Sequence, residues 1–264
     1  MIDKVITAKN ITKIYNLGKI NQNKVLNNIS LEIDAGEFVC IMGASGSGKT
    51  TLINNLSTVD FPTSGDIFIE GENIKAMTEK ELCNFRTNRL GFVFQSFNLI
   101  ESLNIYDNIS MPLLLAKLDN KTIDDRINKV CEQLNIENLI QKYPRECSGG
   151  EIQRIAIARA IVSNPKLIIA DEPTGNLDSH NSCGLLEILS DLNEMGITIL
   201  MVTHDPFIAS YSSRVLYIKD GIITHEIKRG NLNQKDYYLK IDDICSSAYK
   251  KMLSREEKIK NEKK

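Results

Sequence analysis

The chain has 264 residues, a formal net charge of −2, and 42% hydrophobic and 25% charged residues. This balance is typical of a soluble globular protein with a substantial core, and the lack of a basic surplus argues against a nucleic-acid partner. No run of about 18 apolar residues could span a bilayer, and the first residues, MIDKVITAKNITKIY, lack the apolar stretch of a signal peptide. We therefore expect a cytoplasmic protein.

The first strand expected along the chain is FVCIM, residues 38–42, followed by a glycine-rich loop and a helix-compatible sequence. Four further apolar or β-branched runs predict strands: GFVFQ at 91–95, LIIAD at 167–171, ITILMVTH at 197–204 and RVLYIKDG at 214–221. Helical periodicity between several of them predicts an α/β fold with a mostly parallel core sheet. The stretch TSGDIFIEGENI, residues 63–74, alternates around turn glycines and predicts a peripheral antiparallel hairpin.

Between about residues 97 and 160 the strand pattern gives way to helical patterns, at 105–118, at 122–136 and after the two glycines at 149 and 150. We interpret this region as a helical subdomain inserted in an α/β domain of residues 1–230. Residues 231–264 predict a helical extension that ends in the charged tail SREEKIKNEKK. This tail could contact a membrane surface or a partner, but acidic residues interrupt its bases, which favours a solvated helix end.

Six cysteines are scattered without any C-x-x-C pair, so neither a zinc site nor a disulfide framework is expected. They are Cys40, Cys83, Cys131, Cys147, Cys183 and Cys245. Cys40 lies inside the first expected strand and is interpreted as a small core residue.

The loop after the first strand fits the phosphate-binding pattern G-x-x-x-x-G-K-[ST] between a strand and a helix. Its residues are Gly43, Ala44, Ser45, Gly46, Ser47, Gly48, Lys49 and Thr50. Glycines let successive backbone N–H groups turn toward one point, Lys49 brings a positive charge to the outer phosphates, and the Thr50 hydroxyl can bind Mg²⁺. A phosphate site is therefore predicted at the end of residues 38–42.

A second cluster of polar residues follows other expected strands. Asp171 and Glu172 end the strand LIIAD, where Asp171 would hold magnesium and Glu172 would polarise an attacking water. By themselves they could be a solvated acidic pair that caps a strand, a reading that the phosphate loop disfavours. Gln95 and His204 also end strands and could reach a γ-phosphate, although each alone also fits an ordinary core or surface residue.

The segment ECSGGEIQRIAIARA, residues 146–160, places Ser148, Gly149 and Gly150 directly before helical periodicity. A glycine-lined helix N-terminus can bind an anion, because its first backbone N–H groups have no partner within the helix.

In order and spacing these motifs resemble the ATPase subunits of ABC transporters, and the likeness covers about residues 2–230. The matching residues are the phosphate loop, Gln95, SGGE at 148–151, LIIADE at 167–172, NLD at 176–178 and His204. The resemblance implies ATP and Mg²⁺ as cofactors, with the metal held by Thr50, Gln95 and Asp171. It also implies catalytic roles for Glu172, His204 and Gln95, and nucleotide contacts from Tyr15, which would stack on adenine, Thr51 and Asp178.

In this family two ATPase domains close head to tail, so that Ser148, Gly149 and Gly150 of one copy would contact the γ-phosphate held by the other. The predicted partner at this helix is therefore a second copy of the chain. Cys147 stands where the family usually has leucine, and Ile152 where it usually has glutamine. The second departure removes a polar side chain near the interface.

The sequence ADEPTGNLDS resembles the branch that includes macrolide exporters, lipoprotein-releasing complexes and a cell-division regulator. Residues 201–230, followed by NQKDYYLKI at 233–241, look most like the bacitracin-type peptide-resistance ATPases. The resemblance implies a separate membrane permease as partner, a place on the inner face of the membrane, and a possible sensor kinase reached through the permease. Residues 97–115 are the expected permease contact, although Met111, Leu113, Leu114 and Leu115 could instead be core.

Rival functions differ in what they require. A division-type or lipoprotein-release ATPase that drives a permease-like partner without peptide transport would share every motif. A DNA-repair ATPase would need a long heptad insertion, and a translation factor would need a second phosphate loop; the sequence has neither.

Overall fold

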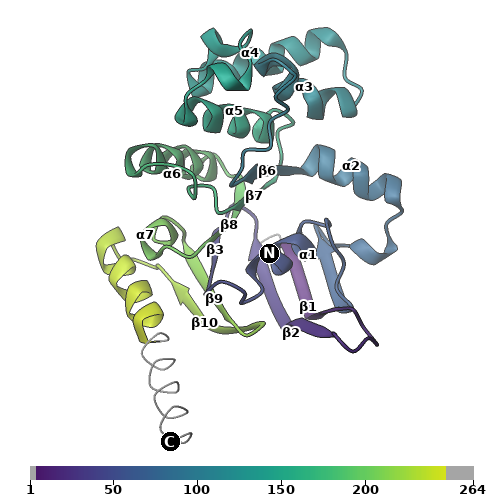
Figure 1. Ribbon diagram of the computed structural model, residues 1–264, viewed down its shortest axis with the longest axis vertical. Helices are drawn as coiled ribbons and strands as arrows, with labels where there is room; N and C mark the ends of the chain where they lie inside the picture. The colour runs from purple at the N-terminus through teal and green to yellow at the C-terminus, as the bar shows by residue number, and fades with distance from the viewer. Residues whose placement is uncertain (1–3, 248–264) are drawn as a thin grey trace, which may run out of the picture.

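The computed structural model describes residues 4–247, which form two sheets and a layer of helices (Figure 1). The larger sheet has the strand order β10-β9-β3-β8-β7-β6, and the smaller has the order β2-β1-β4-β5. Neighbours from β9 through β6 are parallel, while β10 pairs antiparallel with β9. This arrangement confirms the expected α/β fold with a mostly parallel core sheet.

All five strands expected in the core sheet are present. Their bounds are β3 Phe38–Met42, β6 Leu90–Phe94, β7 Leu167–Asp171, β8 Thr198–Thr203 and β9 Arg214–Lys219, with β10 at Ile222–Lys228. Every residue of β3 and β8 is buried. Strands covered on both faces are continuous apolar runs, which is why they could be read from the sequence.

The smaller sheet was predicted only in part. The hairpin of β4 (Ser64–Ile69) and β5 (Glu72–Asn73) confirms the expectation, but β1 (Lys4–Tyr15) and β2 (Asn23–Asp34) were not predicted. Both long strands contain an asparagine with positive φ, and their pairing shifts register at several points. Such bulges break the alternation of buried and exposed residues that identifies a strand.

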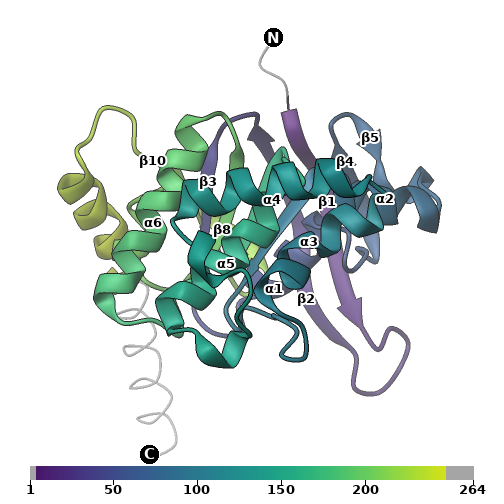
Figure 2. The same ribbon diagram turned by 90° about the horizontal axis from the view of Figure 1, so that it is seen from above.

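Helices flank the core sheet and form the layer drawn at the top of Figure 1. The expected helical region contains α3 (Ile105–Leu115), α4 (Asn120–Leu134) and α5 (Gly149–Ile161), and Figure 2 shows them grouped over the sheet. The other helices are α1 Lys49–Leu56, α2 Glu79–Arg89, α6 Ser179–Glu194 and α7 Pro206–Ala209, and short 3₁₀ turns span Ile74–Ala76, Glu137–Leu139 and Pro144–Glu146. Helix α2 was not predicted.

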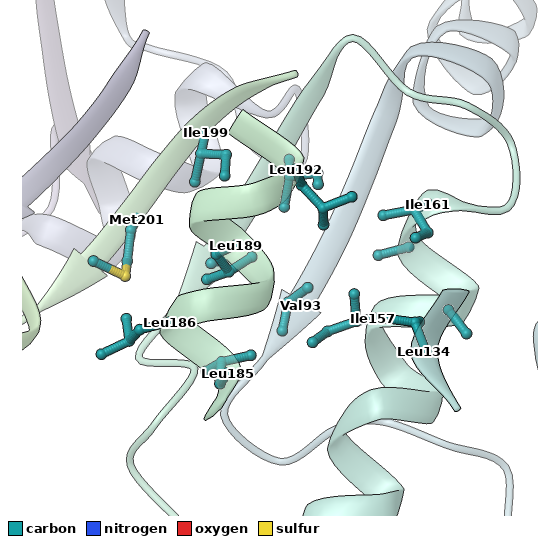
Figure 3. Close-up of a cluster of buried hydrophobic side chains, with 14 of the residues drawn as sticks. Val93, Leu134, Ile157, Ile161, Leu185, Leu186, Leu189, Leu192, Ile199 and Met201 are labelled. Atoms are coloured by element: carbon teal, nitrogen blue, oxygen red, sulfur yellow. The ribbon is translucent and has the colours of Figure 1, made fainter. Parts of the chain in front are cut away.

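One apolar cluster joins the helical layer to the core sheet. In Figure 3, Leu185 and Leu189 of α6 lie near Val93 of β6, with Ile157 of α5 beyond. A second cluster fills the space between the smaller sheet, α1 and the other face of the core sheet. The two clusters fix the carboxyl ends of the core strands relative to α5, and those ends carry the site.

Residues 234–247 are helical and pack against the core sheet. Tyr237 and Ile241 of this helix are fully buried, and the Tyr237 hydroxyl donates to the carbonyl of Ile227 at 3.0 Å. The predicted helical extension is thus present up to residue 247, and the charged tail SREEKIKNEKK lies outside the described residues.

Between residues 4 and 247, no helix is both long and apolar enough to cross a membrane. All six cysteines are free thiols, and Cys40 is fully buried, as expected.

Candidate functional site

The topology brings four of the predicted motifs to one edge of the core sheet. Strands β3, β8, β7 and β6 are consecutive neighbours and run parallel. Their carboxyl ends lead into the phosphate loop, His204, Glu172 and Gln95 in that order. Ligands of parallel α/β sheets bind at this edge.

The phosphate loop has a backbone that requires glycine at two points. Gly48 adopts φ 103° directly before α1, and a Cβ on Gly43 would lie 2.2 Å from the carbonyl oxygen of Ile218. No side chain caps the N-terminus of α1, so its first N–H groups remain available to an anion. The buried Ser47 Oγ has no hydrogen-bond partner within residues 4–247. An unpaired buried hydroxyl and uncapped N–H donors fit a phosphate chain.

Lys49 is the charged residue of this loop, and it is only 7% exposed. Its Nζ donates to the carbonyl oxygens of Gly43 at 2.9 Å and Ala44 at 3.1 Å. Burial lowers the pKa of Lys49, while the negative charges of Glu172 and Asp171 oppose that shift. A buried ammonium that is held only by neutral carbonyls is matched to an anionic ligand.

Asp171 ends β7 beside these groups. Burial raises the pKa of its carboxyl, the neighbouring Glu172 raises it further, and Lys49 lowers it. A cation would favour the ionised form, so the carboxylate fits a magnesium ligand. The described residues contain no cluster of three or more His, Cys, Asp or Glu side chains that could hold a metal. The Thr50 hydroxyl and the Gln95 amide stay the other predicted Mg²⁺ ligands.

Glu172, the predicted base, has an unusual backbone conformation with φ 45°. For a residue other than glycine, this left-handed conformation costs about 1 kcal/mol or more. The backbone is held by two hydrogen bonds, from Glu172 N to Val202 O and from Gly175 N to Glu172 O, each 3.0 Å long. The carboxylate lies 3.4 Å from Nδ1 of His204, whose side chain is 68% exposed. Their action on an attacking water molecule stays a prediction.

Gln95 follows β6 and is exposed. The side-chain amide of Asn176 donates to its backbone carbonyl at 2.9 Å, and a Cβ on Gly175 would approach its Nε2 to 2.7 Å. Asn176 therefore holds the backbone of Gln95, and the missing side chain of Gly175 leaves room for the Gln95 amide.

Tyr15 ends β1 and is 39% exposed. Its hydroxyl donates to Asp60 Oδ2 at 2.9 Å, and Nζ of Lys13 lies 4.9 Å from its ring centroid. Burial raises the pKa of Tyr15, as does the hydrogen bond to Asp60, while a hydrogen bond with Thr51 lowers it. Strand β1 contacts α1, the helix that follows the phosphate loop, and stacking of the ring on adenine stays a prediction.

Ser148, Gly149 and Gly150 lie elsewhere, at the start of α5 in the helical layer (Figure 1). Ser148 caps the helix, and Glu151 completes a capping box by accepting the Ser148 N–H and hydroxyl, each at 2.7 Å. The sequence suggested that the hydrogen-bond donors at this helix start are free, but the Glu151 carboxylate accepts from two of them. The N–H groups of Gly149 and Gly150 remain without helical acceptors.

Asp178 caps α6 by accepting from the Asn181 backbone and side chain, both at 2.8 Å. These hydrogen bonds lower the pKa of the Asp178 carboxyl, the backbone bond most. Asp60, Asn181 and the capping role of Glu151 were not predicted from the sequence. Only Glu151 carries a local signal, the S-x-x-E spacing of a capping box.

Comparison with known proteins gives a family for this arrangement. The family model described as "ABC transporter" matches residues 26–175. The chain belongs to the ABC transporter family. It is an ATP-binding subunit that hydrolyses ATP with Mg²⁺ as cofactor, and the phosphate loop, Asp171 and Glu172 lie in the part of the chain that the family model matches.

Several relatives are similar over nearly their whole length. The bacitracin export ATP-binding protein BceA of Halalkalibacterium halodurans is 46% identical over 89% of this chain and 92% of its own. The ABC transporter ATP-binding protein YxdL of Bacillus subtilis is 47% identical over 92% of this chain and 93% of its own. Among solved structures, the dimeric ABC transporter cassette MJ0796 is 38% identical, with a TM-score of 0.77, over 84% of this chain and 98% of that one. The same cassette was solved as a post-hydrolysis dimer bound to ADP and Pi.

Proposed function

We propose that this chain powers the export of a peptide antibiotic through a separate membrane permease, as a dimer that closes head to tail on two ATP molecules. The substrate class rests on one observation, the 46% identity to BceA across 92% of that protein. In this proposal the chain lies on the cytoplasmic face of the membrane, held there by the permease, and the permease reports drug to a sensor kinase.

The division of the site within one chain supports the dimer. Lys49, Asp171, Glu172 and His204 lie at one edge of the core sheet, whereas the glycine-lined start of α5 lies in the helical layer. A second copy in head-to-tail orientation would bring its α5 N-terminus to the phosphates. A helix N-terminus stabilises an anion more strongly in a closed interface that excludes water than at an exposed surface.

In the closed site, the residues of this chain have separate tasks. The phosphate loop and Lys49 bind the triphosphate, Tyr15 stacks on the base, and Asp171 with Thr50 and Gln95 holds the metal. Glu172 takes a proton from the attacking water, and His204 holds the water and the terminal phosphate in line. Mg²⁺ supplies neutralising charge at the phosphates when it is bound.

A groove on the helical side supports the permease contact. It has a volume of about 490 Å³ and lies between α2, β6 and α3. Phe92, Phe94, Ile100, Met111 and Leu115 supply its apolar lining. Leu114 and Leu115 are 55% and 65% exposed, whereas Leu113 is fully buried. The predicted contact region 97–115 is therefore part core and part surface, and its exposed leucines with the groove form the proposed docking site.

The proposal is tested by replacing Glu172 with Gln in the native host and measuring growth inhibition by cell-wall-active peptide antibiotics, macrolides and no drug. We expect sensitisation to one class of peptide, because the variant would bind ATP without turnover. Unaltered drug tolerance with filamentous cells or mislocalised lipoproteins would instead favour a division-type or lipoprotein-release ATPase.

A further inference from the structure

Gln153 is a buried polar residue in α5 that the ATP site described above does not use. It is 2% exposed, and its Nε2 donates to the carbonyl oxygen of Pro173 at 2.9 Å. Buried amides are kept where they satisfy a specific partner, because an unpaired one is costly. The partner here is the residue directly after Glu172.

The Glu172–Pro173 turn depends on such anchors. Glu172 has the left-handed φ of 45°, and Pro173 has no N–H of its own to donate. The carbonyl of Pro173 gives the turn a further anchor beyond the two backbone hydrogen bonds of Glu172. Because the Glu172 carboxylate is attached to this backbone, a shift of the turn moves the carboxylate relative to the phosphate loop.

Gln153 also belongs to the first turns of the helix that begins at Gly149. It lies one turn after Gly149 and Gly150, and hydrogen bonds within α5 make this segment move as a unit. The same turn also passes close to α6, since a Cβ added to Gly150 would lie 2.5 Å from Asn181 Oδ1. The start of α5 is thus in direct contact with the Glu172 turn and with the residue that holds Asp178.

We propose that Gln153 is a positioning residue that couples the two ATP sites of the dimer. This inference rests on the proposed head-to-tail dimer, in which α5 contacts the ATP of the partner while Glu172 serves the ATP of its own chain. Binding of the partner's phosphates at Ser148, Gly149 and Gly150 moves or stiffens α5. Gln153 carries that change to Pro173 and positions Glu172 for hydrolysis, so each site hydrolyses ATP faster when the other site also holds ATP.

The test is the variant Gln153→Met, which keeps the length of the side chain and removes the donor. Gln133→Met makes the same replacement at an exposed position of α4 and is the matched control. ATP affinity, kcat, KM and the Hill coefficient of ATP hydrolysis are measured for both variants and the unaltered protein. Gln153→Asn, whose amide is one methylene shorter, serves as a second variant if the methionine does not fold.

We expect Gln153→Met to bind ATP normally while kcat falls about 10-fold or more, because small misplacements of reacting groups cost 10- to 100-fold. The Hill coefficient should fall to about 1, since it measures coupling between sites. Gln133→Met should match the unaltered protein. Unchanged kcat would overturn the coupling, because a merely structural hydrogen bond would alter thermal stability alone. A lower kcat with an unchanged Hill coefficient would also overturn it, because ATP at one site would still affect the other.

Failure of the dimer itself is recognised separately. Glu172→Gln is run on size exclusion with ATP and Mg²⁺. A monomer there would overturn the proposed dimer and the coupling with it. A dimer there, together with unaltered kinetics of Gln153→Met, would overturn the coupling alone.

Discussion

At the scale of single residues, the site combines a buried lysine with a carboxyl group that burial penalises. Lys49 and Asp171 each have a pKa shifted toward the neutral form, and in both cases burial is the main cause. Bound phosphate would favour the charged form of Lys49, and bound magnesium would favour the charged form of Asp171. The charges of Lys49 and Asp171 thus stabilise bound phosphate and magnesium, but their burial lowers the stability of the folded protein without ligand.

Asp171→Asn should therefore stabilise the protein without ligand. The folded state raises the Asp171 pKa, so ionisation of the carboxyl costs stability above that pKa and costs nothing once the carboxyl is protonated. We expect the free energy of unfolding to rise at pH 7.5, because the amide carries no charge that burial would penalise. The gain should shrink as the pH is lowered to 4.5. Denaturant unfolding measures both.

The same variant should lose the rise in melting temperature that ATP and Mg²⁺ give the unaltered protein. Asp191→Asn, at an exposed position of α6, is the control and should leave both properties unchanged. A variant that is less stable than the unaltered protein at pH 7.5 would contradict the assignment of a burial cost to Asp171.

Asp60 should act on nucleotide binding only through Tyr15. Asp60→Asn and Tyr15→Phe each weaken or remove the same hydrogen bond of 2.9 Å, so each should weaken ATP binding by about fivefold, the value of a 1 kcal/mol bond. The double variant should be no weaker than either single variant, and inorganic tripolyphosphate should bind all of them equally. Additive effects in calorimetric titrations would show that Asp60 acts independently of the tyrosine.

At the scale of elements, the outcome of the sequence analysis depended on how local the signal was. Strand β3 is a continuous apolar run and was predicted, whereas β1 carries bulges at its asparagines and was missed. Helix α2 was missed because Leu82 is its only buried residue, although Thr78 and Glu81 form a capping box that could have marked its start. Motif residues were found because they are contiguous. Asp60 and Asn181 were not predicted, because their roles come from side-chain contacts that form only in the folded chain.

The capping box of α5 predicts a charge effect on dimer formation. A backbone hydrogen bond from Ser148 holds the pKa of Glu151 below its usual range, so the residue is ionised at neutral pH beside the expected phosphate contact. Glu151→Gln keeps the capping box and removes the charge. We expect ATP to drive dimerisation at several-fold lower protein concentration in low salt, with the difference shrinking at high salt.

Analytical ultracentrifugation of this variant in the Glu172→Gln background measures the effect. Glu132→Gln, at an exposed position of α4, makes the same change of charge away from the interface. An equal gain in this control would mean that only net charge matters and that Glu151 does not face the nucleotide.

At the scale of the whole molecule, the two predicted parts of the ATP site lie apart within one chain. The phosphate loop half lies at the edge of the core sheet, and the Ser148–Gly150 half lies in the helical layer (Figure 1). Apolar clusters fix both halves to one framework. In the proposed dimer, each ATP site combines the phosphate loop of one chain with the α5 N-terminus of the other. The effect of two substitutions therefore depends on whether the same chain carries both.

The most direct test of this account mixes two inactive variants. Lys49→Ala disables the phosphate loop of its chain, and Ser148→Arg disables the α5 half-site of its chain, so each variant alone should hydrolyse no ATP. In a mixed dimer, one site combines the intact loop of the Ser148→Arg chain with the intact α5 of the Lys49→Ala chain. The account predicts that ATPase activity appears on mixing. A mixture as inactive as its components, or normal activity of Ser148→Arg alone, would contradict it.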